Sequence, residues 1–107
     1  MAVEPIVIET ARRYIEELNK KIPLQSAWVF GSRVRGDATE HSDLDIAVVS
    51  TEFDSNAFLA RRAANRIFYE FESPFSIELH FFGVEDFVDD DEMTNEIKNT
   101  GIELTVN

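Results

Sequence analysis

Apolar residues occur in this chain only in short runs, and none of these runs is longer than four residues. Two of the runs are followed directly by a turn-forming residue: residues 27–30 by Gly31 and residues 46–49 by Ser50. A membrane-spanning helix needs about 20 apolar residues, so none is expected here. Short runs bounded by turn-forming residues are typical of buried β-strands. The chain is therefore expected to build a sheet from short strands.

Two long segments show the three- and four-residue spacing of amphipathic helices. The first covers residues 5–22; Pro5 suits its first turn, Lys20 and Lys21 its last turn, and Pro23 ends it. Its apolar stripe is Ile8, Ala11, Ile15, Leu18 and Ile22. The second starts with Asp54 or Ser55 as the cap and ends before residues 73–74. Its predicted inner face is Leu59, Ala63, Ile67 and Phe71, with Ala60, Ala64 and Phe68 beside them.

Strands are predicted over residues 26–30, 43–49 and 75–82, and a short edge strand over 102–106. A last helix is predicted over residues 90–99, with Gly101 as its C-terminal cap. This order indicates an α+β fold, in which helices pack on a mixed sheet of three to four strands. The length of 107 residues predicts a single domain spanning 1–107.

Charge and composition limit the possible functions. The chain has no cysteine, which excludes disulfides, thiol catalysis and cysteine-ligated zinc. Its net charge is -11, and residues 67–107 hold 11 acidic side chains but a single basic one, Lys98. Such a surface repels phosphates, so polymeric nucleic acid is not an expected partner, whereas a basic protein is. The acidity also fits simple solubility. The N-terminus lacks the pattern of a signal peptide, so a cytoplasmic protein without membrane contact is expected.

Two aspartates lie on one face of the second predicted strand. Leu44, Ile46 and Val48 point to the core by the period of two, so Asp43 and Asp45 point to the opposite face, about 7 Å apart at the backbone. Carboxylate oxygens at that spacing can converge on Mg²⁺. A solvated strand face is the alternative interpretation, but the apolar end of the strand favours a central position in the sheet.

Glu78 is the only acidic residue of the third predicted strand. It shares a face with His80, so it can join Asp43 and Asp45 if the two strands are neighbours. Three acids around one or two Mg²⁺ ions suit phosphoryl or nucleotidyl transfer, because the ions bind triphosphate oxygens and a carboxylate can accept a proton. We expect His80 to neighbour this site rather than to bind the metal.

A candidate phosphate-binding turn follows the first strand. Gly31 lets the backbone approach a phosphate closely, and the N–H groups at a helix start near Ser32 can bind anions. Arg33 and Arg35 flank the turn, and guanidinium groups match phosphate geometry.

These elements form one pattern: Gly31–Ser32, ten intervening residues, then Asp43-x-Asp45. The pattern resembles the nucleotidyltransferase superfamily related to DNA polymerase beta, and more closely the minimal nucleotidyltransferase (MNT) family of small domains. The matching positions are Gly31, Ser32, Arg33, Arg35, Gly36, Ser42, Asp43 and Asp45. Residues 77–79 resemble the family's third-carboxylate strand, although the family most often has aspartate where Glu78 stands. Glutamate is one methylene longer and can still reach a metal.

The resemblance implies a polymerase beta-like fold and an Mg²⁺-dependent transfer of AMP from ATP. Asp43, Asp45 and Glu78 would be the catalytic and metal-binding residues, while Gly31, Ser32, Arg33, Arg35 and Ser42 would bind the nucleotide. MNT proteins commonly act as antitoxins of small helical HEPN-type ribonuclease toxins. Some of them modify a tyrosine hydroxyl of the toxin. The resemblance therefore implies a cytoplasmic toxin–antitoxin system with a protein acceptor and a possible hetero-oligomer.

Two other functions remain open at the level of sequence. A non-catalytic antitoxin could neutralise a basic toxin by stoichiometric binding, through the acidic residues Asp89, Asp90 and Asp91 or through an aromatic face. The aromatic residues are crowded into one part of the chain, and most of them are expected in the core: Phe68, Tyr69, Phe71, Phe75, Phe81, Phe82 and Phe87. Nucleotide transfer to a small molecule is the other alternative. Arg61, Arg62 and Arg66 are expected on a solvated helix face, or else against a partner or a nucleotide.

Overall fold

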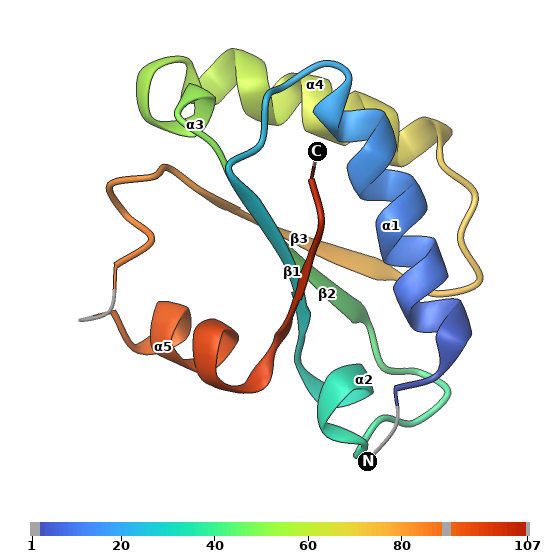
Figure 1. The fold of residues 1–107 in the computed structure, drawn as a ribbon. Helices are drawn as coiled ribbons and strands as arrows, with labels where there is room; N and C mark the ends of the chain where they lie inside the picture. The colour runs from blue at the N-terminus through green and yellow to red at the C-terminus, as the bar shows by residue number, and fades with distance from the viewer. Residues whose placement is uncertain (1–2, 89–90, 107) are drawn as a thin grey trace.

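The computed structural model describes residues 3–88 and 91–106, which form helices around a β-sheet (Figure 1). In chain order the elements are α1 (Pro5–Asn19), β1 (Ser26–Phe30), α2 (Ser32–Arg35), β2 (Leu44–Val49), α3 (Glu52–Ser55), α4 (Ala57–Glu70), β3 (Ile77–Phe82), α5 (Glu92–Thr100) and β4 (Ile102–Leu104). The three predicted long strands and both predicted long helices are confirmed, with boundaries that shift by a few residues.

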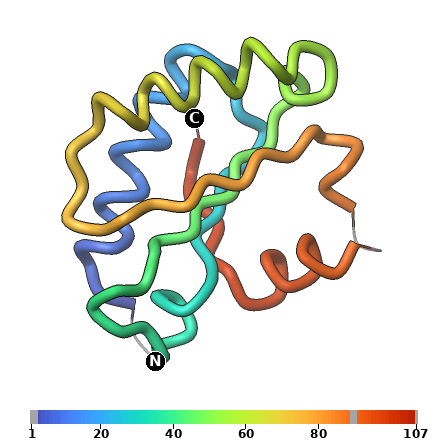
Figure 2. The backbone as a smooth tube through the Cα atoms, turned by 180° about the vertical axis from the view of Figure 1, so that it is seen from behind, coloured from blue at the N-terminus to red at the C-terminus, as the bar shows by residue number. Residues whose placement is uncertain are grey.

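The sheet has four strands in the order β3-β2-β1-β4. β1 pairs antiparallel with β2 and with β4, whereas β2 and β3 run parallel. Figure 2 shows β3 lying alongside β2 at the opposite edge from β4. The predicted α+β class, the mixed sheet and the edge position of the last strand are confirmed. In the described part of the chain, no helix is both long and apolar enough to cross a bilayer.

The two faces of the sheet are covered by different helices, as Figure 1 shows. α1 and α4 pack on one face, where the buried strand residues are Ala27, Val29, Leu44, Ile46, Val48 and Leu104. α5 packs on the other face, where Ile97 contacts Phe30 and Ala47. The alternation predicted for β2 and β3 is confirmed, because Leu44, Ile46 and Val48 belong to the larger core. This second, less covered face is the one toward which Asp45 and Glu78 point.

The predicted inner face of the second long helix is partly wrong. The helix starts at Ala57 with Asn56 as its cap, one or two residues later than predicted, and a short helix that was not predicted, α3, precedes it. Leu59 is 63% exposed, while Ala60 and Ala64 are buried. Small side chains let α4 approach α1 closely, and this contact decides which of two adjacent apolar stripes faces inward. The crowded aromatics are mostly core, as predicted; the partly buried ones that pack against it are Phe68, Phe71, Phe75, Phe81, Phe82 and Phe87, whereas Tyr69 is exposed.

The helix ends differ slightly from the sequence patterns. α1 ends at Asn19, so Lys20 is its C-cap rather than part of its last turn. Asp91 caps α5, and its side chain accepts a hydrogen bond from the N–H of Thr94 at 2.9 Å. The predicted start of the last helix at Asp90 lies outside the described residues, as does Asp89. Gly101 is the C-cap as predicted, and a Cβ there would lie 2.9 Å from the carbonyl oxygen of Val29.

A buried hydrogen bond joins α1 to α4: the hydroxyl of Tyr14 donates to the carbonyl oxygen of Ala64 at 2.9 Å. Burial raises the pKa of Tyr14 far above its usual value, so this hydroxyl stays protonated. We expect Tyr14→Phe to lower the free energy of unfolding by about 1 kcal/mol, because the carbonyl loses a partner. Urea unfolding measures the loss. The exposed Tyr69→Phe serves as the control, and an equal loss in both variants would contradict the role of this bond.

Candidate active site

The turn after β1 brings Gly31 against Asp45. Gly31 has φ +84°, a backbone conformation that side chains disfavour. A Cβ on Gly31 would also collide with the Asp45 carboxylate. The ten-residue spacer of the motif therefore folds back so that its glycine contacts its last aspartate. This contact explains why glycine is required at the first position of the pattern.

Residues 32–43 form the short helix α2 and a loop that returns to the sheet. Arg33 holds this loop: its Nε donates to the carbonyl oxygen of Ser42 at 3.0 Å, and its guanidinium lies 4.2 Å from the ring centre of Phe75. The Oγ of Ser42 accepts from the N–H of Thr39 at 2.8 Å. Arg33 and Ser42 thus set the path of the loop that leads to the acidic residues.

The parallel pairing of β2 and β3 brings the acidic residues of two distant segments together. Asp45 is the register partner of Glu78, so both side chains point to the same face, and His80 follows two residues later on that face. Nε2 of His80 lies 3.2 Å from Oδ1 of Asp45 and 3.9 Å from Oε1 of Glu78. The sequence leaves the pairing of these two strands open, and in the structure they are neighbours.

The three side chains differ in their exposure. The side chain of Asp45 is 19% exposed and that of His80 is 17% exposed, whereas that of Glu78, on the edge strand, is 58% exposed. The His80 ring packs edge-on against Phe30, with 5.0 Å between ring centres. Burial raises the pKa of Asp45; His80 opposes this shift, and the charge of Glu78 adds to it. The site thus holds a carboxylate that is costly to keep ionised without a cation.

The remaining predicted site residues surround this group. Asp43 is exposed and precedes β2 by one residue, but it is not part of the three-residue group formed by Asp45, Glu78 and His80. Arg35 pairs with Asp37 at 3.5 Å and with Glu96 of α5 at 3.6 Å. The roles of Asp43 and of the two arginines toward a metal or a nucleotide stay predictions.

His80 lies closer to the acidic residues than the sequence indicated. It contacts Asp45 directly rather than standing beside the site, since the parallel register aligns Ala47, a residue with a short side chain, with His80. The signal available in the sequence was the two-residue spacing from Glu78. That spacing shows a shared face but not the distance to a side chain on another strand.

The residues present fit a divalent cation. One ligand atom from each of Asp45, Glu78 and His80 lies within 4.8 Å of the other two. Carboxylate oxygens are hard ligands suited to Mg²⁺ and Mn²⁺, and imidazole nitrogen is a common ligand of transition metals. The group thus supplies donors for one ion.

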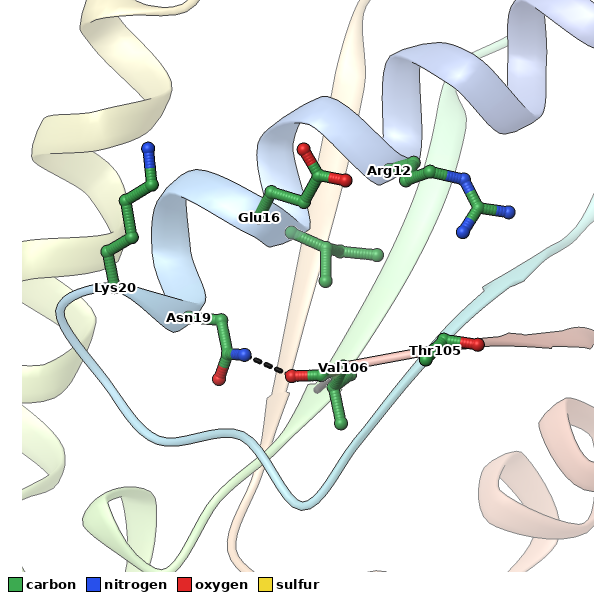
Figure 3. Close-up of a pocket in the computed structure, with 7 residues that line it drawn as sticks. Arg12, Glu16, Asn19, Lys20, Thr105 and Val106 are labelled. Atoms are coloured by element: carbon green, nitrogen blue, oxygen red, sulfur yellow. Dashed lines mark hydrogen bonds between the residues drawn. The ribbon is translucent and has the colours of Figure 1, made fainter.

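Two surface features lie away from these carboxylates. The first is a groove of about 420 Å³ between α1 and the C-terminal segment. Figure 3 shows its lining residues, among which the Nδ2 of Asn19 donates to the carbonyl oxygen of Val106. The second is the outer side of α4, where Arg61, Arg62 and Arg66 are exposed as expected, next to the exposed Phe58 and Tyr69. Neither feature contains a residue of the motif.

A sequence-family profile described as "Nucleotidyltransferase domain" matches residues 9–103, a range that runs from α1 to β4. This chain belongs to that family. The family predicted from the Gly31–Ser32 and Asp43-x-Asp45 pattern is therefore confirmed, and the match includes the group around Asp45.

Known proteins similar to this nucleotidyltransferase domain agree with that assignment. The Haemophilus influenzae protein named "Probable protein adenylyltransferase MntA" is 40% identical over 62 residues, which cover 58% of this chain. The match spans about half of that relative, 53% of its length.

Solved structures support the fold. A crystal structure of a candidate nucleotidyltransferase from Sulfolobus solfataricus superposes with a TM-score of 0.57 and 20% identity, covering 96% of this chain and 89% of that one. A second candidate nucleotidyltransferase gives a TM-score of 0.50 and 21% identity, covering 92% of this chain and 97% of that one. The predicted nucleotidyltransferase fold is thus confirmed.

Proposed function

We propose that this nucleotidyltransferase domain transfers AMP from ATP to a hydroxyl group of a partner protein, in a reaction that depends on Mg²⁺. The observation that carries the proposal is the pairing of Asp45 with Glu78 on one face of the sheet, with Gly31 against Asp45, inside the range that the family profile matches. The name of the Haemophilus influenzae relative supports a protein as the acceptor.

In this proposal the acceptor oxygen attacks the α-phosphorus of ATP, and the bond from that phosphorus to the β-phosphate oxygen breaks. Pyrophosphate leaves, and the hydroxyl proton passes to the Glu78 carboxylate. Glu78 suits this role because it is more than half exposed and lies on an edge strand, where a second molecule can reach it. Asp45 contacts His80, and Asp43, which is exposed one residue before β2, would add a further carboxylate to the site.

A divalent cation bound by Asp45 and Glu78, with Asp43, would neutralise triphosphate charge and stabilise the in-line transition state. The turn at Gly31 and Ser32 would hold the triphosphate tail. We assign Arg33 and Ser42 to keeping that turn in position. Arg33 donates to the carbonyl oxygen of Ser42, and the Oγ of Ser42 accepts from Thr39 within the returning loop. Arg35 would add a positive charge at the edge of the site.

The acceptor is proposed to be a tyrosine of a small helical HEPN-type toxin, as the resemblance to MNT antitoxins implies. The site lies at an open sheet edge, which suits an acceptor residue carried by another protein better than an enclosed small molecule. A complex of the two proteins would place the tyrosine next to Glu78.

The test is to mix the protein with a small helical HEPN-type toxin protein, ATP and Mg²⁺, and to weigh that protein by mass spectrometry. We expect a mass gain of one or more AMP units that disappears in Asp43→Asn and Asp45→Asn. No gain with the wild-type protein, together with full neutralisation of the toxin by both variants, would instead indicate an antitoxin that acts by binding alone.

A further inference from the structure

We propose that His80 is a metal ligand, and that it makes this site bind Mn²⁺ more tightly than Mg²⁺. The proposal deepens the proposed function, since it rests on the metal site formed by Asp45 and Glu78. His80 does not belong to the motif of glycine, serine and acidic residues. Its contribution comes from this chain's own arrangement of β2 and β3.

The distances suit three ligands on one ion. Adjacent ligand atoms around a cation, with bonds of about 2.1 Å, lie about 3.0 Å apart in octahedral and about 3.4 Å apart in tetrahedral geometry. Nε2 of His80 is 3.2 Å from Oδ1 of Asp45 and 3.9 Å from Oε1 of Glu78. The first separation lies within this range and the second is longer, while all three ligand atoms lie within 4.8 Å of one another, so the exposed Glu78 side chain must move toward the other two for one cation to contact all three.

The His80 ring is already oriented for such a role. It packs against Phe30 and is largely buried, so Nε2 faces the two carboxylates without a rotamer change. A pre-positioned nitrogen loses little conformational freedom when it binds a metal. The other histidine of the chain, His41, lies exposed in the loop before β2 and pairs only with the adjacent Glu40 in the described contacts.

The chemistry of the donors then decides the metal. Mg²⁺ prefers oxygen ligands in near-ideal octahedral geometry, whereas imidazole nitrogen is a ligand of transition metals. Mn²⁺ is a transition metal that also suits carboxylates, so two carboxylates and one imidazole favour it over Mg²⁺. If His80 only donates a hydrogen bond to Asp45, its removal should not weaken Mn²⁺ binding more than Mg²⁺ binding.

The experiment titrates the protein, without nucleotide, with Mn²⁺ at about pH 8, because metal ligands must be deprotonated to bind. Free Mn²⁺ is followed by electron paramagnetic resonance, and Mg²⁺ is added in competition. We compare wild type, His80→Ala, His80→Gln and the control His41→Gln. His80→Gln keeps an amide donor for Asp45 but removes the imidazole nitrogen.

We expect both His80 variants to bind Mn²⁺ on the order of tenfold more weakly, with a much smaller change for Mg²⁺, while His41→Gln equals wild type. Electron spin-echo modulation of bound Mn²⁺ is expected to show coupling to a histidine nitrogen that is lost in His80→Gln. Wild-type Mn²⁺ affinity in His80→Gln, or bound Mn²⁺ without nitrogen coupling, would overturn the proposal.

These measurements are independent of AMP transfer. If transfer is absent but Mn²⁺ binds with nitrogen coupling, the proposed function fails and the ligand role of His80 stands. If transfer occurs and no nitrogen coupling is found, the proposed function stands and the ligand role of His80 fails. Absence of Mn²⁺ binding to the wild-type protein would contradict the ligand role directly.

Discussion

Asp45→Asn is expected to lower the rate of AMP transfer on the order of 10³-fold, because it removes the best-ordered negative charge of the site. Asp45 contacts His80 and faces Glu78 and Gly31, so it lies at the centre of the group. The rate is measured by incorporation of labelled AMP into the partner. Asp86→Asn, in an exposed turn, is the matched control and should retain the wild-type rate.

The same variant should not lose stability at neutral pH. The pKa of Asp45 is raised in the folded state, mainly by burial, so the ionised carboxylate destabilises the fold at pH values above both its unfolded and its folded pKa. Asparagine is neutral and removes this cost. We therefore expect an equal or higher Tm at pH 7, and a smaller difference as the pH falls below the unfolded pKa. A Tm several degrees lower at pH 7 would show that the carboxylate is structural.

Gly31→Ala is expected to damage both stability and function. With φ +84° and ψ -160°, Gly31 has a backbone conformation that is essentially restricted to glycine and costs an alanine about 1–3 kcal/mol, and the new Cβ must also displace the Asp45 carboxylate. We expect the free energy of unfolding to fall by about 2–4 kcal/mol and AMP transfer to fall as far as in Asp45→Asn. Urea unfolding and the labelled-AMP assay measure the two effects.

Gly36→Ala provides a comparison at a second glycine with positive φ, in the left-handed helical conformation and away from Asp45. Gly36 has φ +94° and caps the end of α2 in an exposed position. Gly36→Ala should lower the free energy of unfolding by about 1 kcal/mol, which is substantially less than the loss in Gly31→Ala. Equal losses in the two variants would mean that contact with Asp45 is unimportant.

Local patterns in the sequence predicted most elements and the faces of the strands. The alternation in residues 43–49 placed Asp45 opposite Leu44 and Ile46, and the structure confirms this, because side-chain direction in a strand has a period of two. The spacing from Gly31 to Asp45 identified the family. Both signals lie within a few residues or one loop, so they need no knowledge of distant contacts.

Adjacent apolar stripes on a helix cannot be separated by such patterns. Leu59 and Ala60 are neighbours in the sequence, and both belong to plausible stripes of α4. The packing of α4 on the core buries Ala60 and leaves Leu59 63% exposed. The short helix α3, which ends at Ser55 just before α4, was likewise not predicted from the sequence.

Residues and spacing alone established the short strands, the helical segments, the acidic character and the nucleotidyltransferase motif, because each is a local or compositional property. The tertiary structure alone decided that β3 runs parallel to β2 in the register that pairs Asp45 with Glu78 and brings His80 to both. That register joins segments 33 positions apart. It depends on how the helices pack over the sheet, because strand pairing at this separation is set by the burial of whole elements rather than by local preference.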